Sequence, residues 1–274
     1  MIRIGIAGIP LSCKERTYKD GVIYTRNLGL SALEIQLSRG VVMEESKAKE
    51  TGEIAKQCDI ELSLHAPYYL NFAGRPREME MSFEKMNIAG AMAQLLDAKT
   101  MVVHPGFYGN HSKKETLLLI IQNLRLLRDD FKSKGIETNI GIETMGKKDV
   151  FGSLDEIAET CHHVAGIVPV LDFGHIHARG NGCLQNTDDF YNIFKKMEGL
   201  SLTHYLSHIT GVAYNNAGAL YHLPIRKGDL SFMKLMEVIL ENNYNITLIS
   251  ESPILEHDAV YTQILLDRAM ELSK

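Results

Sequence analysis

The stretch Val168-Pro169-Val170-Leu171-Asp172-Phe173-Gly174-His175-Ile176-His177 decides the fold. A short apolar run leads directly into Asp172, and His175 follows three positions later. This is the pattern of a buried parallel strand that delivers polar side chains at its C-terminal end. Pro169 has no backbone N–H to give to a neighbouring strand, so we expect the pairing to be weakest at the start of this strand.

The same pattern recurs along the chain, with short apolar runs that end at His65, His104, Glu143, His208 and Glu251. Successive end residues lie roughly 30 to 40 positions apart, which is room for one strand, one helix and two loops. We therefore expect strands at residues 2–6, 32–36, 62–65, 101–104, 139–143, 168–172, 206–208 and 247–251. Helical periodicity predicts helices at residues 18–28, 44–58, 77–96, 117–131, 153–161, 188–197, 230–241 and 258–272.

Repeated strand–helix alternation without a linker or a shift in composition predicts a single (β/α)₈ TIM-barrel domain over residues 1–274. A doubly wound open sheet is the competing fold, but no glycine-rich phosphate loop follows the first strand. In a TIM barrel the active site lies at the C-terminal ends of the strands. The polar residues that end the strands should therefore converge on one face.

The converging side chains are of two kinds, acidic and basic. They are the carboxylates of Glu143, Asp172 and Glu251, and the imidazoles of His65, His104, His175 and His208. Burying three carboxylates together without a cation would cost desolvation and repulsion. A divalent metal relieves both costs, and mixed imidazole and carboxylate ligation suits Zn, Mn or Fe rather than Ca.

Composition sets wider limits on the function. The net charge of −5 counts mildly against a nucleic-acid partner, although a local basic rim is enough to hold phosphates. The four cysteines form no CxxC pair, which favours a reducing, cytoplasmic compartment. No apolar run approaches the roughly 20 residues that span a bilayer, so we expect a soluble protein without a membrane partner.

As an ensemble, six motifs resemble those of the endonuclease IV family, in order and at compatible spacing from about residue 1 to 260. They are His65-Ala66-Pro67-Tyr68-Tyr69-Leu70-Asn71, His104-Pro105-Gly106, Ile142-Glu143-Thr144, Leu171-Asp172-Phe173-Gly174-His175, His208-Ile209 and Glu251-Ser252-Pro253. The family comprises zinc-dependent apurinic/apyrimidinic endonucleases with a (β/α)₈ fold. The resemblance implies cleavage 5′ to an abasic site in damaged double-stranded DNA, leaving a 3′-hydroxyl and a 5′-deoxyribose phosphate. We expect a monomer.

The resemblance also implies the metal ligands. It assigns His65 and His104 to a first zinc, Glu143 to a bridging position, Asp172, His208 and Glu251 to a second zinc, and His175 and His222 to a third. The remaining family ligand of the third site, an Asp, falls on Leu220, which cannot coordinate a metal. We therefore expect two zinc ions and a weak or absent third, with Asp229 as a possible replacement ligand. Glu143 and Glu251 are the expected catalytic carboxylates.

The resemblance further implies DNA contacts by Tyr68, an aromatic near the flipped nucleotide. A basic rim including Arg39, Arg179 and Arg226 would hold phosphates.

Two other functions remain open. The tetrad Glu143, Asp172, His208 and Glu251 also resembles the single-metal site of sugar isomerases and epimerases with xylose-isomerase-like barrels. A damaged-DNA binder with degraded catalysis is the third interpretation, motivated by Leu220.

Overall fold

Within residues 1–37 and 43–272, which the computed structural model describes, eight parallel strands close into a barrel in the order β1-β10-β7-β6-β5-β4-β3-β2. The strands are β1 Ile2–Ala7, β2 Ala32–Gln36, β3 Glu61–His65, β4 Thr100–Val103, β5 Asn139–Glu143, β6 Ile167–Asp172, β7 Tyr205–Ile209 and β10 Ile246–Ser250. This closure confirms the TIM-barrel prediction. Arg39 lies outside the described residues.

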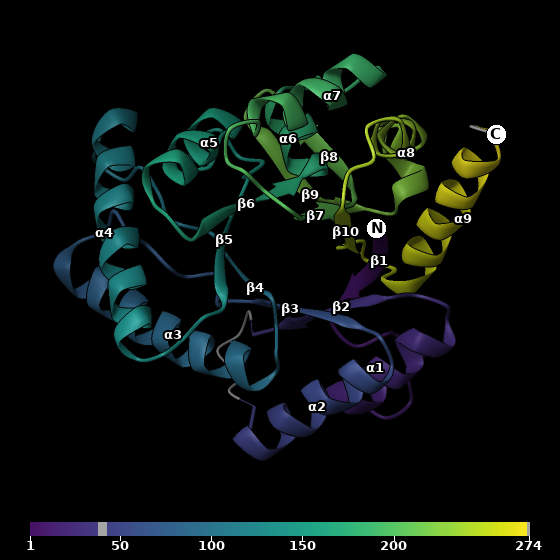
Figure 1. Cartoon of the computed structure of the whole chain (residues 1–274). Helices are drawn as coiled ribbons and strands as arrows, with labels where there is room; N and C mark the ends of the chain where they lie inside the picture. The colour runs from purple at the N-terminus through teal and green to yellow at the C-terminus, as the bar shows by residue number, and fades with distance from the viewer. Residues whose placement is uncertain (38–42, 273–274) are drawn as a thin grey trace.

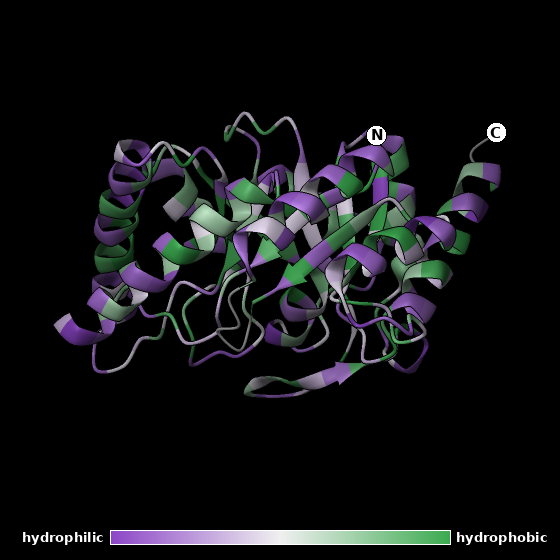
Figure 2. Cartoon of the chain, turned by 90° about the horizontal axis from the view of Figure 1, so that it is seen from below, coloured by the Kyte–Doolittle hydropathy of each residue, from purple (hydrophilic) through white to green (hydrophobic). Residues whose placement is uncertain are grey.

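Helices form an outer ring around the barrel (Figure 1). They are α1 Tyr18–Asn27, α2 Glu45–Gln57, α3 Pro76–Leu95, α4 Lys113–Ser133, α5 Leu154–His163, α7 Thr187–Lys196, α8 Phe232–Glu241 and α9 Glu256–Leu272. Capping boxes fix where several of them begin, as at Ser112 before α4 and Ser153 before α5. Along the helices, hydrophilic and hydrophobic residues alternate in stripes, as expected for an amphipathic layer that covers a sheet (Figure 2).

The inside of the barrel is filled by its own small apolar cluster, made of Ala32, Val102, Val170, Leu206 and Ile249. A larger cluster lies between the strands and the helices. In a strand, residues two positions apart point to the same face. The residues two positions after the interior cluster are therefore directed into the barrel one layer nearer the C-terminal end: Glu34, His104, Asp172, His208 and Glu251. The period of two along each strand thus places polar side chains at the C-terminal end of this apolar interior.

Besides the 3-10 turn Ile225–Lys227, a helix and a hairpin in the described part of the chain were missing from the sequence prediction. The first is the short helix α6, Phe173–Arg179, which starts directly after β6 because the Asp172 side chain caps it by accepting the His175 N–H at 2.7 Å. The second is the antiparallel hairpin of β8, Gly211–Asn215, and β9, Gly218–Leu223, which carries His222.

Pro169 is accommodated within β6 as the sequence suggested. The ladder between β6 and β7 begins only at Val170, one residue after the proline. On the other side, Pro169 lies opposite Ile142 of β5. The missing N–H therefore coincides with the late start of one of the two ladders.

Candidate metal centre

Glu143 lies at the middle of the predicted site and is fully buried at the end of β5. Its Oε2 lies 2.8 Å from Nε2 of His104 and 3.4 Å from Nε2 of His65. Its Oε1 lies 3.2 Å from Nδ1 of His175 and 3.4 Å from Nδ1 of His208. The two oxygens of one carboxylate thus face two different sets of imidazoles.

His65, His104 and Glu143 form the first group whose ligand atoms could hold one metal ion. Nδ1 of His65 donates to the carbonyl oxygen of Ala66 at 2.8 Å, because a carbonyl can only accept. The neutral ring therefore presents Nε2, as a lone pair, to the group. The Tyr68 ring packs against both histidines, with ring centroids 5.0 Å from His65 and 5.3 Å from His104.

Glu143, Asp172, His208 and Glu251 form the second group, with ligand atoms all within 4.8 Å of one another. Three of its buried atoms have no hydrogen-bond partner: Oε1 of Glu143, Oδ2 of Asp172 and Nδ1 of His208. Leaving buried polar atoms unpaired costs about 1–3 kcal/mol each. All three are metal-ligating atoms aimed at the same space, so the residues fit a divalent cation.

Asp172, His175 and His222 form a third group. Nδ1 of His175 donates to the carbonyl oxygen of Thr144 at 3.0 Å, and Nδ1 of His222 donates to that of Glu251 at 3.1 Å. Each neutral ring then carries its lone pair on Nε2, and the two Nε2 atoms face each other at 3.4 Å. Such an arrangement needs a proton or a cation between the rings.

The third group lacks a carboxylate ligand of its own. Oδ1 of Asp172 is engaged with the His175 N–H, so only Oδ2 is free of a hydrogen bond, and Asp172 also belongs to the second group. Leu220 is 53% exposed on β9 and offers no ligand atom. Asp229 is held elsewhere, by Nε2 of His177 at 3.1 Å and by the Tyr214 hydroxyl at 2.5 Å.

Without a metal, the histidines act as the counter-charges of the carboxylates. Burial disfavours a charged imidazole, but Glu143 and Glu34 outweigh this effect and raise the pKa of His65 to about 9. Burial is likewise outweighed at His175, where Asp172 and Glu143 raise the pKa to about 10. The pKa of Glu143 is held well below its usual range, because the surrounding histidines outweigh its burial. A metal ion would have to displace these protons.

The predicted DNA contacts lie in different environments. Tyr68 is 40% exposed beside the first group, and Arg226 is exposed with its guanidinium 5.6 Å from the centre of the Tyr261 ring. Arg179 is largely buried, and its guanidinium donates to backbone carbonyls, including that of Val150 at 3.0 Å. Its contacts tie α6 to the loop after β5.

A cavity of about 410 Å³ opens above the three groups. His104, His175, His222 and Glu251 line its floor. Its wall is mostly uncharged and includes Tyr68, Phe107, Leu220 and Tyr221, with Lys147 as a cation. Each of the three groups therefore contributes at least one side chain to the lining of this pocket.

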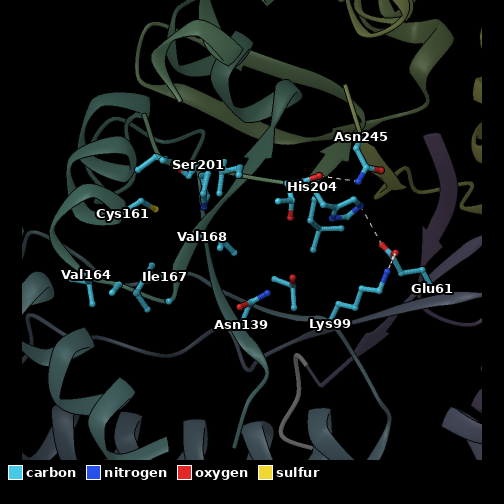
Figure 3. A pocket seen from close by; sticks show the side chains of 18 of the residues that line it. Glu61, Lys99, Asn139, Cys161, Val164, Ile167, Val168, Ser201, His204 and Asn245 are labelled. Atoms are coloured by element: carbon cyan, nitrogen blue, oxygen red, sulfur yellow. Dashed lines mark hydrogen bonds and ion pairs between the residues drawn. The ribbon is translucent and has the colours of Figure 1, made fainter. Parts of the chain in front are cut away.

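A second cavity, of about 910 Å³, lies at the opposite end of the barrel, where the strands begin (Figure 3). Nζ of Lys99 lies 2.6 Å from Oε2 of Glu61, and Nε2 of His204 lies 3.5 Å from Oε1 of the same carboxylate. The residues that line this cavity include none of the predicted ligands.

Sequence reasoning missed Glu34, a fully buried carboxylate of β2 whose Oε2 lies 3.2 Å from Nε2 of His208. The signal was available, since Glu34 follows Ala32 of the interior cluster by two residues. It was overlooked because Glu34 lies within an expected strand rather than at its end.

Comparisons with known proteins agree with the TIM-barrel fold. The model of a family described as "Xylose isomerase-like TIM barrel" matches residues 22–266. An uncharacterized protein of Methanocaldococcus jannaschii is 32% identical over 95% of both chains. A probable endonuclease 4 of Mycoplasmopsis pulmonis is 27% identical over 80% of this chain and 79% of the relative.

Solved structures repeat the fold. A D-tagatose 3-epimerase-like protein has a TM-score of 0.73 at 22% identity, with 97% of each chain covered. Endonuclease IV from Thermus thermophilus has a TM-score of 0.72 at 16% identity, with 97% of this chain and 99% of that chain covered. In the described part of the chain, no helix has the length and apolar character needed to cross a membrane.

Proposed function

We propose that this chain, which belongs to the xylose isomerase-like TIM barrel family, is a zinc-dependent endonuclease of the cytoplasm that cleaves DNA 5′ to abasic sites. The products would be a 3′-hydroxyl and a 5′-deoxyribose phosphate. One observation carries the proposal: Glu143 offers one oxygen to the His65–His104 pair and the other to the group of His208. A carboxylate shared in this way suits two neighbouring metals, which a phosphodiesterase uses and a single-metal epimerase does not need.

The metals and the carboxylates of the site would have different roles in the reaction. Two bound divalent metals would orient the scissile phosphate and neutralise charge on the departing 3′ oxygen. Glu143 belongs to both groups, so it would be a ligand of both metals. Glu251 lines the pocket, and its Oε1 lies 3.6 Å from Nδ1 of His208, so it would help to hold the second metal next to the bound substrate. Mn or Fe would fit the same mixed ligands.

Tyr68 is proposed to contact the extrahelical abasic sugar. Its ring covers the first group of ligands and is partly exposed to the pocket. An abasic nucleotide has no base pair to break, so its entry into the pocket costs little. Arg39 and Arg226 are proposed to hold DNA phosphates. Arg179 is proposed to act indirectly, since it orders the loop that ends near Val150.

The number of metals follows from the supply of ligands. We propose two zinc ions in the groups that share Glu143. The third group would be weakly occupied, because Leu220 removes a carboxylate and Asp172 has one oxygen free of hydrogen bonds for two groups. Losing a charged ligand from a partly open site favours dissociation.

A sugar epimerase is the second candidate. The pocket volume of about 410 Å³ and its largely uncharged wall suit a small polar substrate better than a polyanion. In that function Glu143 and Glu251 would lie on either side of a ketose at a single metal.

Elemental analysis of dialysed protein and an assay on a duplex with one abasic site test the proposal together. The expected result is about two zinc ions per chain and nicking of the abasic strand only, with the undamaged duplex as control. One metal per chain, no nicking and turnover of a ketose would replace the nuclease with the epimerase.

A further inference from the structure

We propose that Glu34 is a positioning residue of the second metal group, which holds the His208 ring so that its Nδ1 faces the metal. The proposal rests on the metal centre of the proposed function, and it holds whether the substrate is DNA or a sugar. Glu34 belongs to none of the three ligand groups, yet it is fully buried next to one of them.

The hydrogen bonds of Glu34 determine which nitrogen of His208 is protonated. Oε2 of Glu34 lies 3.2 Å from Nε2 of His208. An ionised carboxylate can only accept, so Nε2 carries the hydrogen. The lone pair of the neutral ring is then on Nδ1, the buried nitrogen that has no hydrogen-bond partner. This nitrogen lies 3.4 Å from Oε1 of Glu143 and 3.6 Å from Oε1 of Glu251, among the other ligand atoms.

The Glu34 carboxylate is itself held in place. The Ser63 hydroxyl donates to Oε2 at 2.9 Å, and the Gln36 amide donates to Oε1 at 2.9 Å. Ser63 lies directly opposite Glu34 in the ladder between β2 and β3. Because both of its oxygens accept hydrogen bonds from neighbouring strand residues, the Glu34 carboxylate that accepts from His208 is held in a fixed position. Histidines that bind metals commonly have such a hydrogen-bonded carboxylate on their other nitrogen.

If two metals bind, charge gives a second reason for the presence of Glu34. Two divalent cations carry four positive charges, whereas the ligand carboxylates Glu143, Asp172 and Glu251 supply three negative ones. Glu34 supplies the fourth from immediately behind His208. A carboxylate in this position also makes the imidazole a stronger electron donor to its metal.

Zinc binding by Glu34→Gln is the test, with competition by a chelator as the readout. Glutamine keeps the shape and can still accept from Nε2 but removes the charge, so zinc affinity at one site should fall about 10- to 100-fold. The other zinc should stay within about threefold. Ser63→Ala is the matched control, because it removes one donor to Glu34 and leaves the contact with His208 intact.

Nitrogen-15 NMR of the zinc-loaded wild-type protein tests the geometry without any substitution. The expected spectrum shows His208 with its hydrogen on Nε2. A hydrogen on Nδ1 would overturn the proposal even if Glu34→Gln failed to fold. Equal zinc affinity in the variant and the wild type, or equal weakening of both sites, would also overturn it. Failure of DNA nicking in the wild type would count against the nuclease and leave these measurements standing.

Discussion

Replacing Glu143 with glutamine should abolish catalysis while preserving the barrel. The side chain is fully buried and four imidazoles face it, so glutamine removes the charge and leaves the shape. Removing one partner of a buried charge pair costs about 3–5 kcal/mol. If the transition state loses that much stabilisation, nicking should fall about 10²- to 10⁴-fold.

The assay is single-turnover nicking of a duplex with one abasic site, with metal content measured on the same sample. Glu61→Gln provides a matched control, because Glu61 is a largely buried carboxylate at the opposite end of the barrel, held by Lys99 and Thr247 at 2.6 Å each. The Glu61→Gln variant should have a lower free energy of unfolding, with unchanged metal content and nicking rate. More than about a tenth of wild-type turnover in Glu143→Gln, a loss of under about 1.4 kcal/mol, would refute the bridging role.

Three further outcomes are expected. His104→Ala should eliminate nicking but leave most epimerase activity if the substrate is a sugar, so unchanged nicking would count against the nuclease. Leu220→Asp should raise the metal content from about two toward three and increase the nicking rate; three tightly held metals in the dialysed wild type would contradict this. The pKa values of His65 and His175 are raised from 6.5 to about 9 and about 10. The ion pairs of these protonated rings therefore stabilise the metal-free fold fully below pH 6.5. This stabilisation is lost as the pH rises through about 9 and about 10. Zinc needs the unprotonated rings, so the Tm gap between zinc-loaded and metal-free protein should widen from about pH 6 to 9; a gap that narrows would be inconsistent with these shifts.

The barrel could be predicted because most units of the chain repeat one local rule. A short apolar run forms a buried strand, and the polar residue that follows it lies at the C-terminal end of the barrel. Val102 leads to His104, and Val170 leads to Asp172, by the same step of two residues. Closure then brings these ends together without any further information from the loops.

What sequence reasoning missed depends on contacts between distant segments. Glu34 and His208 are 174 positions apart, and nothing local to β2 indicates that its mid-strand carboxylate has an imidazole partner. Asp172 ends a strand, and its second task as the cap of α6 depends on where the chain turns next. The basic character of Arg179 predicts a phosphate contact, but its hydrogen bonds to backbone carbonyls such as that of Val150 could not be read from the sequence.

The choice between one metal and two depends on a small part of the barrel. The tetrad of the second group comes from β5, β6, β7 and the end of β10, which are consecutive in the barrel order. The first group adds only His65 and His104, from β3 and the end of β4, the two strands that precede β5 around the barrel. A single-metal site and a two-metal site therefore differ by two imidazoles on the free side of Glu143. Both imidazoles are buried or partly buried, with Nε2 within 3.4 Å of Oε2 of Glu143, so under the proposed function they are the ligands of the additional metal. The proposed single-metal epimerase site does not require these two imidazoles as ligands, whereas the proposed two-metal nuclease does, and this is the structural reason to test DNA before sugars.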